Sequence, residues 1–135
     1  MYQQMIFVNL ATNDVDASKK FFTELGYTIN PQFSTDDCAC VVISNTIIAM
    51  FLSKKRYADF TKKEIADSAK TSEVLLCLSA ESREKVDELV NKAAAAGGTA
   101  NDDVQDQGFM YGRSFDDLDG HSWEIVWMDP AAVQS

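Results

Sequence analysis

The sequence of 135 residues is poor in histidine and contains no long apolar run. Its single histidine, His121, excludes a metal site made of two histidines and one carboxylate within one subunit. No window approaches the roughly 18 unbroken apolar residues of a membrane-spanning helix, and the N-terminus lacks a basic segment ahead of a long apolar run. These absences predict a cytoplasmic protein with no membrane partner.

Cysteine is also scarce, with Cys38, Cys40 and Cys77 giving an odd number. Cys38 and Cys40 are two residues apart, so on a strand their side chains point the same way and cannot bond each other without strain. The pattern favours small buried or half-buried thiols in a reducing compartment over a redox motif.

Basic residues number 12 against 21 acidic ones, which gives a net charge of -9 and a pI near 4.4. Nucleic acid and anionic membrane surfaces would both be repelled, so neither is expected as a partner. Half of the basic residues lie between residues 54 and 71. This stretch is interpreted as a solvated basic linker, with a cationic lid over an acidic ligand as the functional alternative.

The order strand, helix, three strands occurs twice, in module 1 (5–53) and in module 2 (72–128). A chain of 135 residues (1–135) with 46% hydrophobic residues is long enough to form the core of one domain made of two closely packed modules. We therefore predict an α+β fold of paired βαβββ modules forming a curved mixed sheet around a cleft, where a ligand would bind.

In module 1 the patterns predict a strand at 5–12 and a helix at 14–26, with Asp14 as N-cap and Gly26 as terminator. Further strands are expected at 27–33, 38–43 and 46–52.

Module 2 repeats this order with a buried strand at 73–79 and a helix at 81–97 that ends at two glycines. Its last three strands are expected at 99–105, 109–116 and 122–128, the final two joined by an Asp-Gly turn.

The last predicted strand places Glu124 on the face opposite Trp123 and Ile125. A carboxylate among apolar neighbours is suited to act as a general base, and a solvent-facing or hydrogen-bonded glutamate is the alternative. His121 lies three residues away, hence on the other face, and is expected at the surface beside the turn.

The preceding strand carries Phe109, Tyr111 and Arg113 on one face. Such side chains suit stacking on a flat ligand and pairing with its carboxylate or phosphate. Ordinary sheet packing, with Arg113 at the edge, is the other interpretation.

Two segments, FVNLATNDVDASKKFFTELGY at 7–27 and FDDLDGHSWEIV at 115–126, resemble the opening and closing signatures of the vicinal oxygen chelate superfamily. That superfamily includes glyoxalase I, bleomycin-resistance proteins and extradiol dioxygenases. The resemblance implies a homodimer and four metal-ligand positions, which fall on Phe7, Met50, Glu73 and Glu124 in this sequence.

Phenylalanine has no lone pair and methionine offers only a soft thioether, so the two carboxylates would hold a hard ion weakly at best. The sequence therefore favours no bound metal over a weakly held divalent ion, and the single histidine removes iron-type extradiol chemistry.

Two ligand-directed functions remain open at this point, beside a dimeric scaffold that binds no ligand. The first is a glyoxalase- or bleomycin-resistance-like protein with a degraded metal site that binds or acts on a small organic molecule, contacted by Phe7, Met50 and the Phe109–Arg113 segment. The alternative is a metal-dependent lyase or isomerase, similar to lactoylglutathione lyase, that uses Glu124 as base or ligand.

Overall fold

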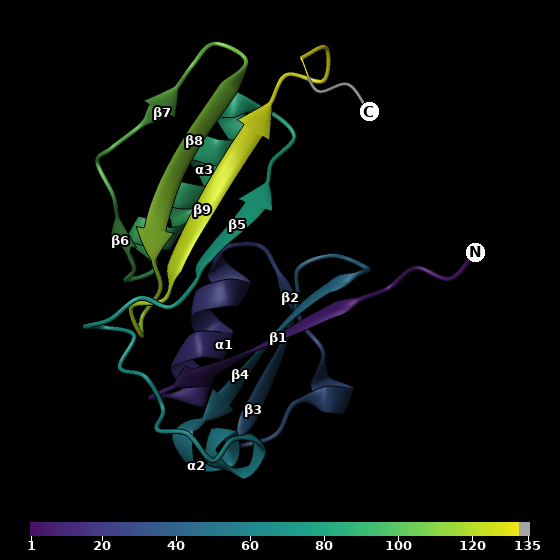
Figure 1. The fold of residues 1–135 in the computed structure, drawn as a ribbon, viewed down its shortest axis with the longest axis vertical. Helices are drawn as coiled ribbons and strands as arrows, with labels where there is room; N and C mark the ends of the chain where they lie inside the picture. Colours follow the sequence, from purple (N-terminus) through teal and green to yellow (C-terminus); the bar gives the residue numbers. More distant parts are fainter. Residues whose placement is uncertain (133–135) are drawn as a thin grey trace. The chain divides into compact units, whose positions relative to one another are not determined.

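The computed structural model describes residues 1–132 and divides into two compact units, unit 1 (Met1–Asp67) and unit 2 (from Ser68 onward). Each unit contains one sheet with a helix across one of its faces (Figure 1). No helix of the described residues is long and apolar enough to cross a membrane.

Unit 1 consists of a strand, a helix and three further strands, followed by a short basic helix. The elements are β1 (Ile6–Thr12), α1 (Val15–Glu24), β2 (Thr28–Ile29), β3 (Cys38–Val42), β4 (Ile47–Ser53) and α2 (Lys54–Tyr57), with 3₁₀ helices at Pro31–Phe33 and Ala58–Phe60. The strands are ordered β1-β4-β3-β2, with β1 parallel to β4 and the remaining pairs antiparallel.

Unit 2 repeats this topology with one extra short strand. Its elements are β5 (Leu75–Ser79), α3 (Arg83–Ala95), β6 (Thr99–Ala100), β7 (Gln105–Asp106), β8 (Met110–Asp116) and β9 (Ser122–Met128). The order is β5-β9-β8-β6, with β5 parallel to β9 and β7 paired to β8. The structure thus confirms the α+β fold and its two βαβββ modules.

Local signals explain where both long helices begin and end. The Asp14 side chain accepts a hydrogen bond from the backbone N–H of Ala17, and the Ser82 hydroxyl accepts one from that of Lys85. Gly26 ends the turn that follows α1. Its φ of 103° is a backbone conformation that residues with a side chain disfavour. Helix α3 is shorter than the predicted helix 81–97, because its N-cap is Ser82 and it ends at Ala95.

Two of the predicted strands are interrupted. The segment 27–33 forms only β2, because Asn30 accepts a hydrogen bond from the backbone of Gln32 and starts a 3₁₀ helix at Pro31. The segment 99–105 is split between β6 and β7, where the Asn101 side chain accepts from the backbone N–H of Asp103. In both places a side-chain turn takes the backbone out of the sheet.

The expectation of a buried strand at 73–79 is also wrong. The strand begins at Leu75 and lies at the edge of its sheet, and Leu75 and Cys77 are both exposed. Cys38 and Cys40 are buried as predicted, so Cys77 is the exception among the three thiols.

Each helix packs on one face of its own sheet and leaves the other face uncovered by a helix. In unit 1, Phe22 of α1 packs against Phe51 of β4 with ring centroids 4.7 Å apart. In unit 2, Val86 and Val90 of α3 and Ile125 of β9 are fully buried. We call the helix-free face the open face of each unit.

Candidate functional site

The open face of unit 2 centres on Glu124, in the middle of β9. The register places Cys77 of β5 and Ser114 of β8 directly beside Glu124. Its chain neighbours Trp123 and Ile125 point to the α3 face and are buried, whereas Glu124 is half-exposed. The predicted orientation of Glu124 is therefore confirmed.

The Glu124 carboxylate forms no hydrogen bond or ion pair within residues 1–132. The charge of Glu124 acts on the adjacent Cys77. Burial of the thiol raises the pKa of Cys77, and the charge of Glu124 raises it further. Cys77 is consequently held as a neutral thiol, a weak hydrogen-bond donor, beside a carboxylate with unused acceptor capacity.

Small side chains flank the centre of this face. Glu124 lies between Cys77 and Ser114, and the next outward residue of β9, Val126, lies between Ser79 and Gly112. Gly112 is buried, and a methyl group placed there would lie 3.3 Å from a methyl carbon of Val126. The strands beside β9 thus add little bulk around the carboxylate.

Tyr111 and Arg113 occupy the α3 face, opposite Glu124. The Tyr111 hydroxyl donates to Asp87 Oδ1 at 2.7 Å, and Arg113 donates to the same oxygen at 3.0 Å and to Asn91 at 3.2 Å. The bond from Tyr111, assisted by Arg113, lowers the pKa of Asp87 against the opposing effect of desolvation. These two predicted ligand contacts therefore connect β8 to α3, and the structure does not bring them together with Glu124.

The third residue of that group, Phe109, lies just before β8 and is 48% exposed. It lies in the turn between β7 and β8, where Arg83 donates to the carbonyl of Gly108 at 2.9 Å. Arg83 also pairs with both oxygens of Asp106. The Phe109–Arg113 segment is thus held in place by hydrogen bonds to residues of α3.

The remaining predicted positions lie on both units. Phe7 is 57% exposed on β1, and Met50 is half-buried on β4, each on the open face of unit 1. They are not register partners, because Phe7 pairs with Ile48 and Met50 with Asn9. Glu73 is exposed and precedes β5 by two residues, outside the sheet.

These four positions do not fit the metal site that the resemblance implies. Phe7 supplies no ligand atom and Met50 supplies a thioether, whereas hard divalent ions require oxygen or nitrogen donors. Of the two carboxylates, only Glu124 is held in position by a strand.

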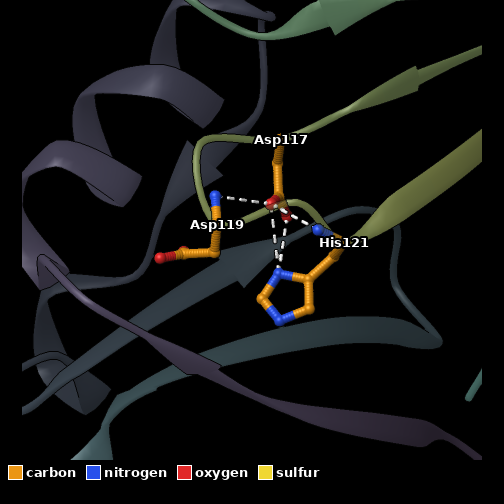
Figure 2. Close-up of side chains that lie close together, drawn as sticks. All are labelled: Asp117, Asp119 and His121. Carbon is orange, nitrogen blue, oxygen red and sulfur yellow. Dashed lines mark hydrogen bonds and ion pairs between the residues drawn. The ribbon is translucent and has the colours of Figure 1, made fainter. Parts of the chain in front are cut away.

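A second cluster, missed in the sequence, lies in the turn between β8 and β9 and comprises Asp117, Asp119 and His121 (Figure 2). The side chain of Asp117 is 2% exposed, and that of His121 is 12% exposed. The expectation that His121 lies at the surface is wrong, because its ring folds back onto Asp117 with Nδ1 3.0 Å from Oδ2.

The Asp117 carboxylate accepts hydrogen bonds from four groups. The backbone N–H groups of Asp119 and His121 donate to Oδ1 at 3.0 Å each, and Trp123 Nε1 donates to Oδ2 at 3.0 Å. The fourth donor is His121 Nδ1, which must carry a proton because a carboxylate only accepts.

This cluster brings two carboxylates and one imidazole within 4.8 Å of one another, but both oxygens of Asp117 already accept hydrogen bonds, including one from His121 Nδ1. Burial, the largest influence, would lower the pKa of His121, but the hydrogen bond and charge of Asp117 and the charge of Asp119 together raise it. The arrangement is a turn stabilised by a buried carboxylate. The aspartate-rich spacing before Trp123 was the signal available in the sequence.

The segment at the start of unit 2 also packs on this turn. Ser68 Oγ donates to the carbonyl of Asp119 at 2.6 Å, and a methyl group on Gly120 would approach the Ser68 carbonyl oxygen to 2.7 Å. Gly120, with φ of 89°, therefore permits both the turn and the close packing of residues 68–69.

Comparison with known proteins supports the fold. The family model for bleomycin resistance protein-like N-terminal domains matches residues 4–44. No curated protein matches the chain.

Several solved structures share the whole architecture. A hypothetical protein from S. aureus is 28% identical with a TM-score of 0.77, covering 94% of each chain. A glyoxalase/bleomycin resistance protein/dioxygenase family enzyme from Burkholderia phytofirmans is 20% identical with a TM-score of 0.75, covering 93% of this chain and 99% of that one. A fosfomycin resistance protein from Listeria monocytogenes is 18% identical with a TM-score of 0.66, covering 94% and 92%. Together with the paired βαβββ modules, these matches show that the chain shares the fold of glyoxalase/bleomycin resistance proteins.

Proposed function

We propose that this protein binds a small organic molecule against the open face of unit 2, and that binding requires no metal ion. The observation that carries the proposal is the chemistry of the four implied ligand positions, where Phe7 and Met50 replace hard donors and Glu73 lies outside the sheet. Glu124 is then available to the ligand itself, since it has no partner within residues 1–132.

The comparisons are consistent with a binding function. The matched family model is described by bleomycin resistance, and one structural neighbour is a fosfomycin resistance protein. Binding that holds a molecule without converting it needs shape and polar complementarity only. A sheet face with one unpaired carboxylate, small flanking residues and exposed Leu75 and Met128 at its ends offers polar and apolar contacts for such a molecule.

The alternative is a lyase or isomerase in which Glu124 removes a proton next to a carbonyl. The unpartnered carboxylate favours this function, because a general base needs a free oxygen within reach of the substrate. The reaction also needs an electrophile to stabilise the enediolate. Arg113, which could supply this positive charge, lies on the opposite face and is bound to Asp87. The geometry therefore supports binding better than turnover.

A turnover assay separates the two functions. We expect methylglyoxal with glutathione, in the presence of Ni²⁺ or Zn²⁺, to give no lactoylglutathione above the protein-free rate. Glu124→Gln should be indistinguishable from the native protein in this assay. Robust turnover that Glu124→Gln abolishes would instead establish the lyase function.

A further inference from the structure

The open face of unit 2 carries negative charge and no positive charge. Its strand residues include Glu124 and Asp116, and none is lysine, arginine or histidine, as the register of β5, β9 and β8 shows. Asp116 accepts a hydrogen bond from Ser122 Oγ at 3.0 Å. Glu124 is therefore the one carboxylate on these strands without a partner in residues 1–132.

The two arginines of unit 2 are both bound on the α3 side. Arg113 donates to Asp87 and Asn91, and its buried Nε has no acceptor among the described residues. The Arg83 guanidinium pairs with Asp106 and lies 5.1 Å from the ring centre of Tyr111. Neither arginine is placed to meet a molecule that lies against Glu124.

The charge of the chain is concentrated in the same unit. From Ser68 onward the sequence holds 13 of the 21 acidic residues but five of the 12 basic residues, which is -8 of the total -9. An excess of one sign raises the local concentration of oppositely charged ligands and accelerates their association. The negative charge of unit 2 and the unpaired Glu124 carboxylate thus both favour a positively charged ligand.

Resting on the function proposed above, we infer that the ligand of this face is an organic cation, an apolar body with an amine or amidine group that donates hydrogen bonds to Glu124. The small residues Cys77 and Ser114 on either side of Glu124 leave room for such a group. The exposed side chain of Leu75, whose register partner Ser122 lies two residues before Glu124, provides apolar surface for the body. This reverses the expectation from the sequence, in which Arg113 would have selected an acidic ligand.

Three probes with one aromatic body test the charge preference: 1-naphthylmethylammonium, 1-naphthylmethanol and 1-naphthylacetate. Each is titrated into ¹⁵N-labelled full-length protein, and dissociation constants are taken from amide shifts on β5, β8 and β9. We expect the ammonium compound to bind about tenfold more tightly than the alcohol, in the range of one charge-assisted hydrogen bond, and the carboxylate to bind most weakly. The preference should shrink as NaCl is raised.

Glu124→Gln should bring the ammonium affinity down to that of the alcohol, while Asp103→Asn, an exposed acidic residue outside the strands, should leave all three affinities unchanged. Equal binding of the three probes on this face would overturn the cation inference and leave the binding function standing. Tightest binding by the carboxylate would also overturn it. If no probe shifts these strands, the proposed function fails and the inference fails with it.

Discussion

Replacing Asp117 by asparagine should destabilise the protein more than any other Asp→Asn or Glu→Gln substitution in unit 2. The substitution keeps the size and shape of the side chain but leaves one acceptor oxygen where the carboxylate has two. If the amide oxygen stays beneath the backbone donors of Asp119 and His121, the amide nitrogen faces Trp123 Nε1, and two donors oppose each other.

The structure sets the size of the effect. Trp123 Nε1 loses a buried, charge-assisted hydrogen bond, which costs roughly 1.5–3 kcal/mol. The remaining bonds from the backbone and from His121 then go to a neutral oxygen and weaken. We expect the free energy of unfolding to fall by about 3 kcal/mol, a large part of the 5–15 kcal/mol typical of a domain.

Urea unfolding followed by tryptophan fluorescence and circular dichroism measures this loss. Asp116→Asn is the matched control, because the adjacent Asp116 is exposed and accepts from Ser122 Oγ; its cost should stay below about 1 kcal/mol. Combining Asp117→Asn with Trp123→Phe should cost less than the sum of the single changes, since they share one bond. A native-like unfolding midpoint for Asp117→Asn would refute this account of the turn.

Three further outcomes follow from the structure. Because Asp117 raises the pKa of His121 above 6.5, this pair should stabilise the fold fully below pH 6.5 and lose that contribution as the pH rises through the folded-state pKa. Between pH 6 and pH 8, the free energy of unfolding should therefore fall more in the native protein than in His121→Gln. Gly120→Ala should be more destabilising in urea than Gly26→Ala, because both have positive φ but only Gly120 would press a methyl group on Ser68; equal costs would contradict the packing described. We also propose that the protein is a homodimer, so light scattering after size exclusion should report twice 15.0 kDa, and a monomer at micromolar concentration would refute this.

The features predicted correctly from the sequence are those that local physical chemistry determines. Asp14 and Gly26 bound α1 through contacts within a few residues, and alternation along β9 placed Glu124 opposite Trp123. The topology followed because the same element order occurs twice, although β2 and β6 are shorter than predicted.

What the sequence did not reveal depends on contacts between distant residues or on side-chain acceptors within turns. Arg113 and Asp87 are 26 residues apart, so the alternation that put Arg113 on one face could not say that α3 covers that face. The Asp-Gly turn was recognised, but the role of Asp117 as acceptor for Trp123 depends on the depth at which the turn is buried.

The metal content of the protein tests the central claim most directly. Protein purified without chelators, dialysed against micromolar Ni²⁺, Zn²⁺ or Mn²⁺ and analysed by inductively coupled plasma mass spectrometry, should contain far less than one ion per chain, because Phe7 and Met50 offer no hard donor and Glu124 is a single carboxylate. Glu124→Gln should give the same low content. One ion per chain, lost in Glu124→Gln, would contradict the proposal that this protein binds its ligand without a metal.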